Sequence, residues 1–79
     1  MKVIGLTKDN CPKCAWAKRA MNEAGHSAIW LDADSDAGKA LAQKHNVEYV
    51  PFFIFIDDAG AVLTTTKNVL SVLAFLRKP

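Results

Sequence analysis

The sequence predicts an α/β fold in which a four-stranded mixed sheet carries helices on both faces. Strand-like and helix-like segments alternate along the 79 residues in the order β-α-β-α-β-β-α. Phe52–Ile56 is apolar at every position, which is typical of a central strand covered on both faces. The opening β-α-β unit predicts a parallel strand pair with a right-handed crossover, and a later hairpin supplies two antiparallel strands.

The first three elements are a strand, a helix and a second strand. Residues 3–7 are apolar and β-branched, and they predict a buried strand. A helix is expected over residues 11–24, with Pro12 in its first turn and Gly25 just beyond its end. Residues 27–31 predict the second strand. Four residues recur at helical spacing and predict the buried face of the helix: Cys14, Ala17, Met21 and Ala24.

A second helix is expected to run to about Lys44. The segment 32–36 offers several aspartate and serine side chains as N-caps. Gly38 is expected to weaken this helix by about 1 kcal/mol relative to alanine, because glycine loses more backbone entropy. One side of the helix is predicted to carry Ala37, Ala40, Leu41 and Lys44.

A hairpin and a last helix complete the predicted fold. After Phe52–Ile56, residues 57–60 predict a turn, and residues 61–66 predict the returning strand. Asn68 can cap a final helix, Val69–Arg77, which is apolar on more than one stripe. One stripe is expected to pack on the sheet. The remainder is either an exposed partner or dimer surface or the inner side of a deeply packed helix, and the sequence leaves both open.

Length and composition exclude several classes of function. We expect one domain over residues 1–79, with 51% hydrophobic residues and no room for a separate cofactor-binding domain. Ten Lys and Arg stand against eight Asp and Glu, a balance too even for a nucleic-acid surface. No stretch approaches the roughly 20 apolar residues that cross a bilayer, and the opening residues lack the features of a signal peptide. We therefore expect a cytoplasmic monomer without nucleic-acid or membrane partners.

The chemistry is predicted to reside in Cys11 and Cys14, which lie between a strand and the first turn of a helix. Cysteines at this spacing can close a short disulfide. The helix N-terminus supplies partial positive charge and unpaired N–H groups, and Lys13 and Lys8 add cationic field. We expect these to lower the pKa of the Cys11 thiol below its free value of ~8.5. Cys11 is expected to be exposed and to attack a substrate disulfide, and the shielded Cys14 to resolve the mixed disulfide.

Two other interpretations of the cysteine pair are a metal site and inert core cysteines. Zinc takes four ligands, and the spacing of His26 and His45 is unlike that of a zinc finger. Placement at a helix start favours redox chemistry over a buried structural role. We predict no metal and no cofactor, and the alternative is a non-catalytic binding or metal-carrying CxxC module.

The pair Val50-Pro51 is the second candidate element. A proline at the start of a central strand lacks a ladder donor, and one reason for it is a cis peptide bond beside a site. Such a bond would leave the backbone of Val50 free to pair with an incoming chain. Trp16 either packs, which we expect, or shapes the surface around the cysteine motif. His26 and His45 are expected to lie at the surface near helix ends.

The order of elements and two motifs resemble the thioredoxin superfamily in its short glutaredoxin-like form, over nearly the whole chain. Residues 31–60, with Val50-Pro51 before an apolar strand and a glycine turn, look like the second half of thioredoxin. Residues 7–14 are similar to glutaredoxins and to the small glutaredoxin-like donors of ribonucleotide reductase. The resemblance implies a thioredoxin fold and a thiol–disulfide oxidoreductase acting on protein disulfides. It also implies Cys11 as nucleophile, Cys14 as resolving cysteine and Pro51 as the family's cis-proline.

Departures from the family pattern bear on the reductant and on substrate binding. Asn10 stands where thioredoxins have tryptophan, whereas Pro12 follows the first cysteine as in glutaredoxins. Tyr49 stands where glutaredoxins place threonine, and residues 61–68 contain no glycine pair. These departures count against a glutathione site and favour a flavin-dependent thioredoxin reductase as the reductant. Glutathione and thioredoxin reductase both stay open as the reductant. Tyr49, Val50 and Pro51 are the candidate substrate-binding residues.

Overall fold

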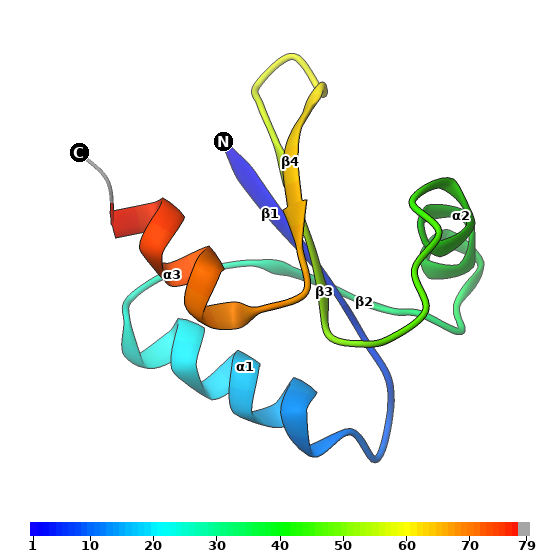
Figure 1. The fold of residues 1–79 in the computed structure, drawn as a ribbon, viewed down its shortest axis with the longest axis horizontal. Helices are drawn as coiled ribbons and strands as arrows, with labels where there is room; N and C mark the ends of the chain where they lie inside the picture. Colours follow the sequence, from blue (N-terminus) through cyan, green and yellow to red (C-terminus); the bar gives the residue numbers. More distant parts are fainter. Residues whose placement is uncertain (78–79) are drawn as a thin grey trace.

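The computed structural model describes residues 1–77; Lys78 and Pro79, which the predicted domain includes, lie outside the described residues. The seven predicted elements occur in the predicted order, as Figure 1 shows. They are β1 (Lys2–Thr7), α1 (Pro12–Glu23), β2 (Ile29–Asp32), α2 (Asp36–Lys44), β3 (Phe52–Ile56), β4 (Val62–Thr66) and α3 (Val69–Arg77).

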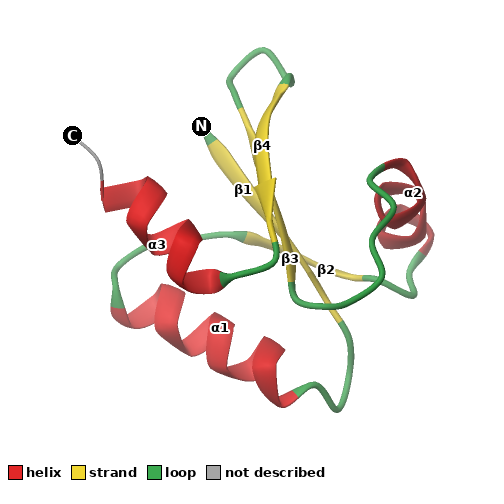
Figure 2. Ribbon diagram, in the orientation of Figure 1, coloured by secondary structure: helices red, strands yellow, loops and turns green. Residues whose placement is uncertain are grey.

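The sheet has the strand order β2-β1-β3-β4. β1 pairs in parallel with β2, and β3 pairs antiparallel with both β1 and β4. Figure 2 shows α1 and α3 next to each other, with α2 well apart from both. The predicted mixed sheet of four strands is therefore confirmed, and β3 lies inside it, as its apolar sequence indicated.

The core between the sheet and helices α1 and α3 is built on β3. Phe53 and Phe55 are fully buried there, and the Phe55 ring packs in a tilted arrangement against Phe75 of α3, with 4.6 Å between ring centroids. Trp30 of β2 packs edge-on against Phe53, with 6.0 Å between ring centroids, and is partly buried at the rim of this cluster. The buried members of this cluster are Val3, Ala17, Met21, Phe53, Phe55, Val69 and Val72.

Helix α1 buries most of its predicted face. Cys14, Ala17 and Met21 are buried, but Ala24 is exposed, because the helix has ended by that residue. Gly25 has a φ of 77°, and the N–H groups of Gly25 and His26 donate to the carbonyls of Asn22 and Met21 at 3.0 Å each. This is the glycine-terminated helix end that the sequence indicated, and it turns the chain back toward β2.

Helix α2 covers the face of the sheet opposite to α1 and α3. The side of α2 that faces the sheet differs from the side predicted from the sequence. Ala37, Ala40 and Lys44 are exposed, whereas Gly38 is buried. Leu41 and Ala42 pack with the buried residues Leu6, Ala33, Phe52 and Ile54. The Ser35 hydroxyl caps the helix by accepting from the Gly38 N–H at 3.1 Å. Gly38 faces the end of β2. Because it has no side chain, the backbone of α2 can approach the backbone of Asp32 and Ala33 closely.

The two alternatives for α3 are resolved largely in favour of burial. Val69 and Val72 are buried, and Leu73, Phe75 and Leu76 pack partly against the core. Leu70 is the large apolar side chain that this helix leaves outside, with 59% of its surface exposed. Elsewhere the predictions differ by one or two residues at element ends: β2 begins at Ile29, and β4 begins at Val62.

Candidate active site

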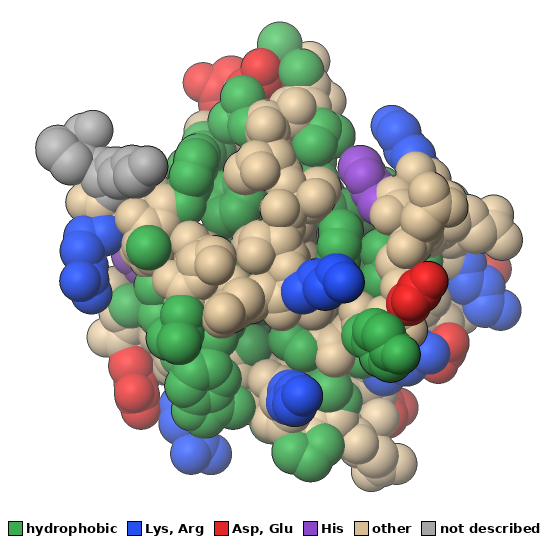
Figure 3. Space-filling model, in the orientation of Figure 1, with side chains coloured by type: hydrophobic (Ala, Val, Ile, Leu, Met, Phe, Trp, Pro, Cys, Tyr) green, Lys and Arg blue, Asp and Glu red, His purple; other side chains and the backbone are tan. Residues whose placement is uncertain are grey.

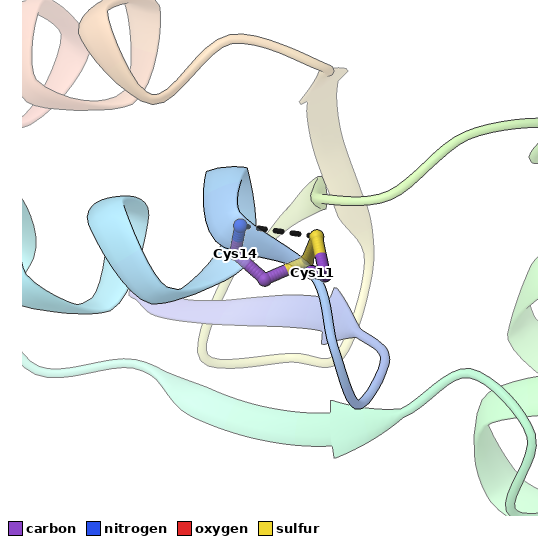
Figure 4. Close-up of a disulfide and its surroundings, with 2 residues drawn as sticks. All are labelled: Cys11 and Cys14. Carbon is purple, nitrogen blue, oxygen red and sulfur yellow. Dashed lines mark hydrogen bonds between the residues drawn. A yellow bond between two sulfur atoms is a disulfide. The ribbon is translucent and has the colours of Figure 1, made fainter.

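Cys11 and Cys14 lie at the start of α1 and are joined in a disulfide, with Cα atoms 5.2 Å apart (Figure 4). Cys11 is the N-cap residue, in an extended conformation, and Cys14 lies one turn into the helix. The Cys14 N–H donates to the Cys11 Sγ at 3.1 Å. Cys11 is partly exposed, whereas Cys14 is only 2% exposed. The expected difference in exposure between the two sulfurs is therefore present.

The turn between β1 and α1 sets the position of Cys11. Asn10 has a φ of 56°, in the left-handed region that asparagine tolerates better than most residues. This backbone reversal directs Cys11 from the end of the strand to the first turn of the helix. In the sequence, Asn10 stood out only as a departure from a family pattern. The pair Asp9-Asn10 before a proline-containing helix start was the signal for this turn.

The surface around the disulfide, here called the dithiol hollow, is more cationic than acidic. It is lined by Cys11, Cys14 and by Lys8, Asp9, Asn10, Pro12, Ala15 and Lys18. The Lys8 Nζ lies 3.8 Å from the Asp34 Oδ1, and both side chains are well exposed. This carboxylate offsets part of the field that Lys8 exerts on the hollow. Lys18 was not among the residues predicted for the site, and its Nζ lies 5.7 Å from the centroid of the Trp30 ring.

A second depression, the Pro51 groove, lies between α1, the loop before β3 and the start of α3. It has a volume of about 400 Å³ and is lined by Lys13, Trp16, Pro51, Lys67, Asn68 and Val69. The peptide bond between Val50 and Pro51 is cis, as the resemblance implied. Lys13 and Pro51 thus line the same groove, whereas Lys8 lines the dithiol hollow. Lys67 and Asn68 were not singled out as site residues, because only the fold brings the end of β4 to α1.

Trp16 corrects an expectation from the sequence. We expected it to pack, yet 51% of its surface is exposed and it lines the Pro51 groove. The physical reason is its position on α1: it follows the buried Cys14 by two residues, which turns it about 200° around the helix from the core-facing side. An aromatic ring held on the outer side of the dithiol helix is available to a partner.

Tyr49 and Val50 line a different depression from Pro51. They line a third depression, the Tyr49 hollow, together with Lys8, Ala33, Ala42, Val47 and Glu48. Tyr49 is 71% exposed, whereas Val50 packs partly into the core beneath α2. The three candidate substrate-binding residues therefore occupy two depressions, and their part in binding stays a prediction.

The histidines and other possible metal ligands are dispersed. No group of three or more His, Cys, Asp and Glu side chains that could hold a metal ion occurs within residues 1–77. His45 is half-buried, with its ring centroid 6.3 Å from that of Phe52, so the prediction that it lies at the surface is wrong. The reason is that His45 ends α2 on its inner side, one turn after Leu41.

None of the helices within residues 1–77 has the length and hydrophobicity needed to span a membrane.

Comparison with known proteins places the chain in a family. The sequence model of the glutaredoxin family matches residues 3–59, from the first strand through the dithiol helix to the turn after β3. This chain belongs to the glutaredoxin family. No curated protein matches it. Together with the adjacent cysteine pair, the family shows that this is a thiol redox protein.

Solved structures show that this glutaredoxin has the thioredoxin fold. Oxidised thioredoxin O2 from Arabidopsis thaliana superposes with a TM-score of 0.66 at 22% identity, covering 98% of this chain and 75% of that one. A thioredoxin from Thermus thermophilus gives 0.63 at 20% identity, covering 94% and 71%. A malarial protein gives 0.67 at 17% identity, covering 98% and 96%. The fold expected from the order of elements is therefore confirmed.

Proposed function

We propose that this glutaredoxin is a dithiol oxidoreductase that reduces protein disulfides, with Cys11 as nucleophile and Cys14 as resolving cysteine. The observation that carries the proposal is the position of Cys11, partly exposed at the N-cap of α1 and bonded to a buried partner one turn later. A thiolate is the attacking species in disulfide exchange, and a helix N-terminus stabilises it. A partly exposed sulfur can meet a protein substrate, whereas Cys14 at 2% exposure can reach only its neighbour.

The proposed reaction takes place in two exchanges. The Cys11 thiolate attacks one sulfur of the substrate disulfide, whose bond breaks and releases the other sulfur as a thiolate that takes up a proton. Cys14 then loses its proton and attacks the Cys11 Sγ, which breaks the mixed disulfide and releases the second substrate thiol. Two electrons have passed from the dithiol to the substrate, and the protein is left with the Cys11–Cys14 disulfide seen here.

A reductant must return two electrons before the next cycle. We infer that a thioredoxin reductase or glutathione does so, and that ribonucleotide reductase is one protein whose disulfide is reduced. Lys13 and Lys8 would favour the Cys11 thiolate through their charge, and Tyr49, Val50 and Pro51 would contact the substrate. We propose that the protein works as a monomer in the cytoplasm, where such a reductant keeps thiols reduced.

The reaction is tested with insulin as the protein disulfide and dithiothreitol as the electron donor. The wild-type protein should accelerate insulin reduction, Cys11→Ser should abolish the acceleration, and Cys14→Ser should accumulate as a mixed disulfide with the substrate. The mixed disulfide is read as a larger species on a non-reducing gel. Turnover by Cys11→Ser would overturn the nucleophile assignment, and full dithiol activity of Cys14→Ser would overturn the resolving role.

The reductant and the alternative metal-carrying role are tested on the same preparation. The oxidised protein is offered glutathione, or NADPH with a thioredoxin reductase, and free thiols are counted after each. Reduction by one of the two identifies the donor. The zinc content of the reduced protein is measured in parallel. Stoichiometric zinc together with no insulin reduction would replace the proposed function by the metal-carrying alternative.

A further inference from the structure

The Pro51 groove carries two lysines from separate elements and no acidic residue. Lys13 comes from the first turn of α1, and Lys67 from the turn between β4 and α3. The two ion pairs found within residues 1–77 involve other groups, the N-terminus with Asp58 and Lys8 with Asp34. Figure 3 shows Lys or Arg side chains beside hydrophobic ones over the region where α1 and α3 begin. An excess of positive charge thus lies in this groove.

The charge is distributed unevenly around the disulfide. On the side of the dithiol hollow, Lys8 is paired with Asp34, and Asp9 is a further lining residue. On the side of the Tyr49 hollow, Glu48 accompanies Lys8. The Pro51 groove is the side on which no carboxylate of the described residues balances the lysines. Clefts lined by one sign of charge raise the local concentration of oppositely charged partners and speed their association.

The remaining lining of the groove suits a peptide segment. Trp16 supplies an exposed aromatic ring, and Pro51 and Val69, both largely buried, line the groove beside it. An exposed aromatic ring beside cationic groups is the kind of anchor around which protein partners bind. The volume of about 400 Å³ lies within the ~300–1,000 Å³ that ligand sites commonly have.

We propose that the Pro51 groove selects protein disulfides whose cysteine is flanked by acidic residues, with Lys13 and Lys67 binding the carboxylates and Trp16 and Pro51 contacting the adjoining chain. This inference rests on the proposed function, because it names the substrate class of the same dithiol. A cysteine flanked by Asp or Glu is drawn to the groove before exchange, whereas one flanked by Lys is repelled. The selection acts on encounter and orientation, so it weakens as salt screens the charges.

The experiment compares peptides that differ only in charge beside the reacting cysteine. Each peptide carries one cysteine in a disulfide with 2-mercaptoethanol, and the two positions on either side hold Glu, Gln or Lys. Fully reduced protein is mixed with each peptide, and the second-order rate constant of exchange is measured. The wild-type protein should react in the order Glu, Gln, Lys, with roughly tenfold between the first and last at low salt, shrinking toward unity at high salt.

Charge reversal in the groove supplies the decisive comparison. Lys67→Glu, which leaves Lys13 beside a carboxylate, should bring the three rates close together, and Lys67→Gln should reduce the spread. Reversal of both lysines, Lys13→Glu with Lys67→Glu, should invert the order so that the Lys peptide reacts fastest. Lys39→Glu is the matched control, because Lys39 is exposed on α2 and its reversal changes the net charge equally. It should keep the wild-type order. An unchanged spread in Lys67→Glu, or an equal change in Lys39→Glu, overturns the inference.

Two further outcomes separate the inference from related hypotheses. A wild-type protein that reacts with the Gln peptide but does not distinguish Glu from Lys retains the proposed function and refutes the selection. A wild-type protein that exchanges with none of the peptides refutes the proposed function itself. A Gln peptide carrying glutathione in place of 2-mercaptoethanol is a further arm. If Lys67→Glu slows only that peptide, the groove takes glutathione and the inference is overturned.

Discussion

The backbone N–H of Cys14 donates a hydrogen bond to the Sγ of Cys11 at 3.1 Å, so the cysteine sulfur occupies the place of the usual oxygen in a helix N-cap. A charged acceptor takes such a bond more strongly than a neutral one. In the reduced protein we expect the same bond, with the partial positive charge of the helix start, to favour the ionised form of Cys11. The geometry that caps the helix is therefore one that suits a thiolate at Cys11, the proposed nucleophile.

The first prediction concerns the ionisation of Cys11 in the reduced state. We expect the pKa of the Cys11 thiol to lie below the free value of ~8.5, because its anion is bonded and faces a helix N-terminus. The measurement is the rate of iodoacetamide alkylation against pH in the Cys14→Ser protein, which has one thiol and keeps the amide donor. The Cys11→Ser protein should alkylate slowly, since Cys14 is buried. A midpoint at or above ~8.5 contradicts the prediction.

The second prediction concerns the ion pair beside the dithiol hollow. Asp34 lies 3.8 Å from the Lys8 Nζ, and it reduces the positive potential that Lys8 exerts there. Asp34→Asn should lower the alkylation midpoint of Cys11 by a fraction of a pH unit, because exposed charges interact weakly through water. In a Lys8→Gln background the same substitution should have less effect. Equal shifts in both backgrounds would show that Asp34 does not act through Lys8.

The third prediction concerns Trp16, which the fold leaves half exposed in the Pro51 groove. Trp16→Ala should slow the reduction of insulin about tenfold, since removing an aromatic anchor from a binding surface commonly costs more than about 1 kcal/mol. Trp16→Phe should retain most of the rate. The alkylation midpoint of Cys11 should stay constant in both variants, which separates lost binding from altered ionisation. An unchanged insulin rate in Trp16→Ala would show that the ring makes no substrate contact.

The fourth prediction contrasts β3, which is apolar throughout, with β4, in which two apolar residues precede three threonines. Phe53 of β3 is fully buried, whereas Leu63 of β4 is half exposed. Phe53→Leu should lower the free energy of unfolding by about 1–2 kcal/mol. Leu63→Ala removes more of its side chain, yet it should change stability by less than ~0.5 kcal/mol. Urea unfolding of both variants tests the contrast, and a larger loss in Leu63→Ala would contradict the burial assigned to β4.

The dithiol helix could be predicted from the sequence because its signals are local. Pro12 marks the first turn and Gly25 the end, and the spacing of Cys14, Ala17 and Met21 marks the buried face. The same holds for β3, whose apolar run requires cover on both faces. Such patterns act within one element, so the order of the elements and the location of the cysteines followed from them.

The composition of the Pro51 groove could not be predicted in this way. Lys67 follows β4 and Trp16 belongs to α1, and only the completed fold brings them to one depression. The buried face of α2 could not be predicted either. When most residues of a helix are small, as in α2, the sequence allows more than one side to face the core. There the choice between Ala37 and Gly38 as the inner residue depends on how closely the helix approaches β2, which is a tertiary property.

The close approach of α2 to β2 gives Gly38 a role opposite to the one its helix propensity suggests. Propensity alone predicts that Gly38→Ala stabilises the protein by about 1 kcal/mol. In the structure, an added Cβ would lie 2.7 Å from the carbonyl carbon of Asp32 and 2.9 Å from the Cα of Ala33. Both are backbone atoms at the end of β2, so relief requires the helix itself to move.

We therefore predict that Gly38→Ala lowers the free energy of unfolding, by about 1–3 kcal/mol, because overpacking against backbone outweighs the gain in propensity. The measurement is urea unfolding beside Ala40→Gly, an exposed position of the same helix that calibrates propensity alone at about 1 kcal/mol. Displacement of α2 would also loosen Leu41 and Ala42 from the core on that face. A Gly38→Ala protein more stable than wild type would show that α2 does not lie this close to β2.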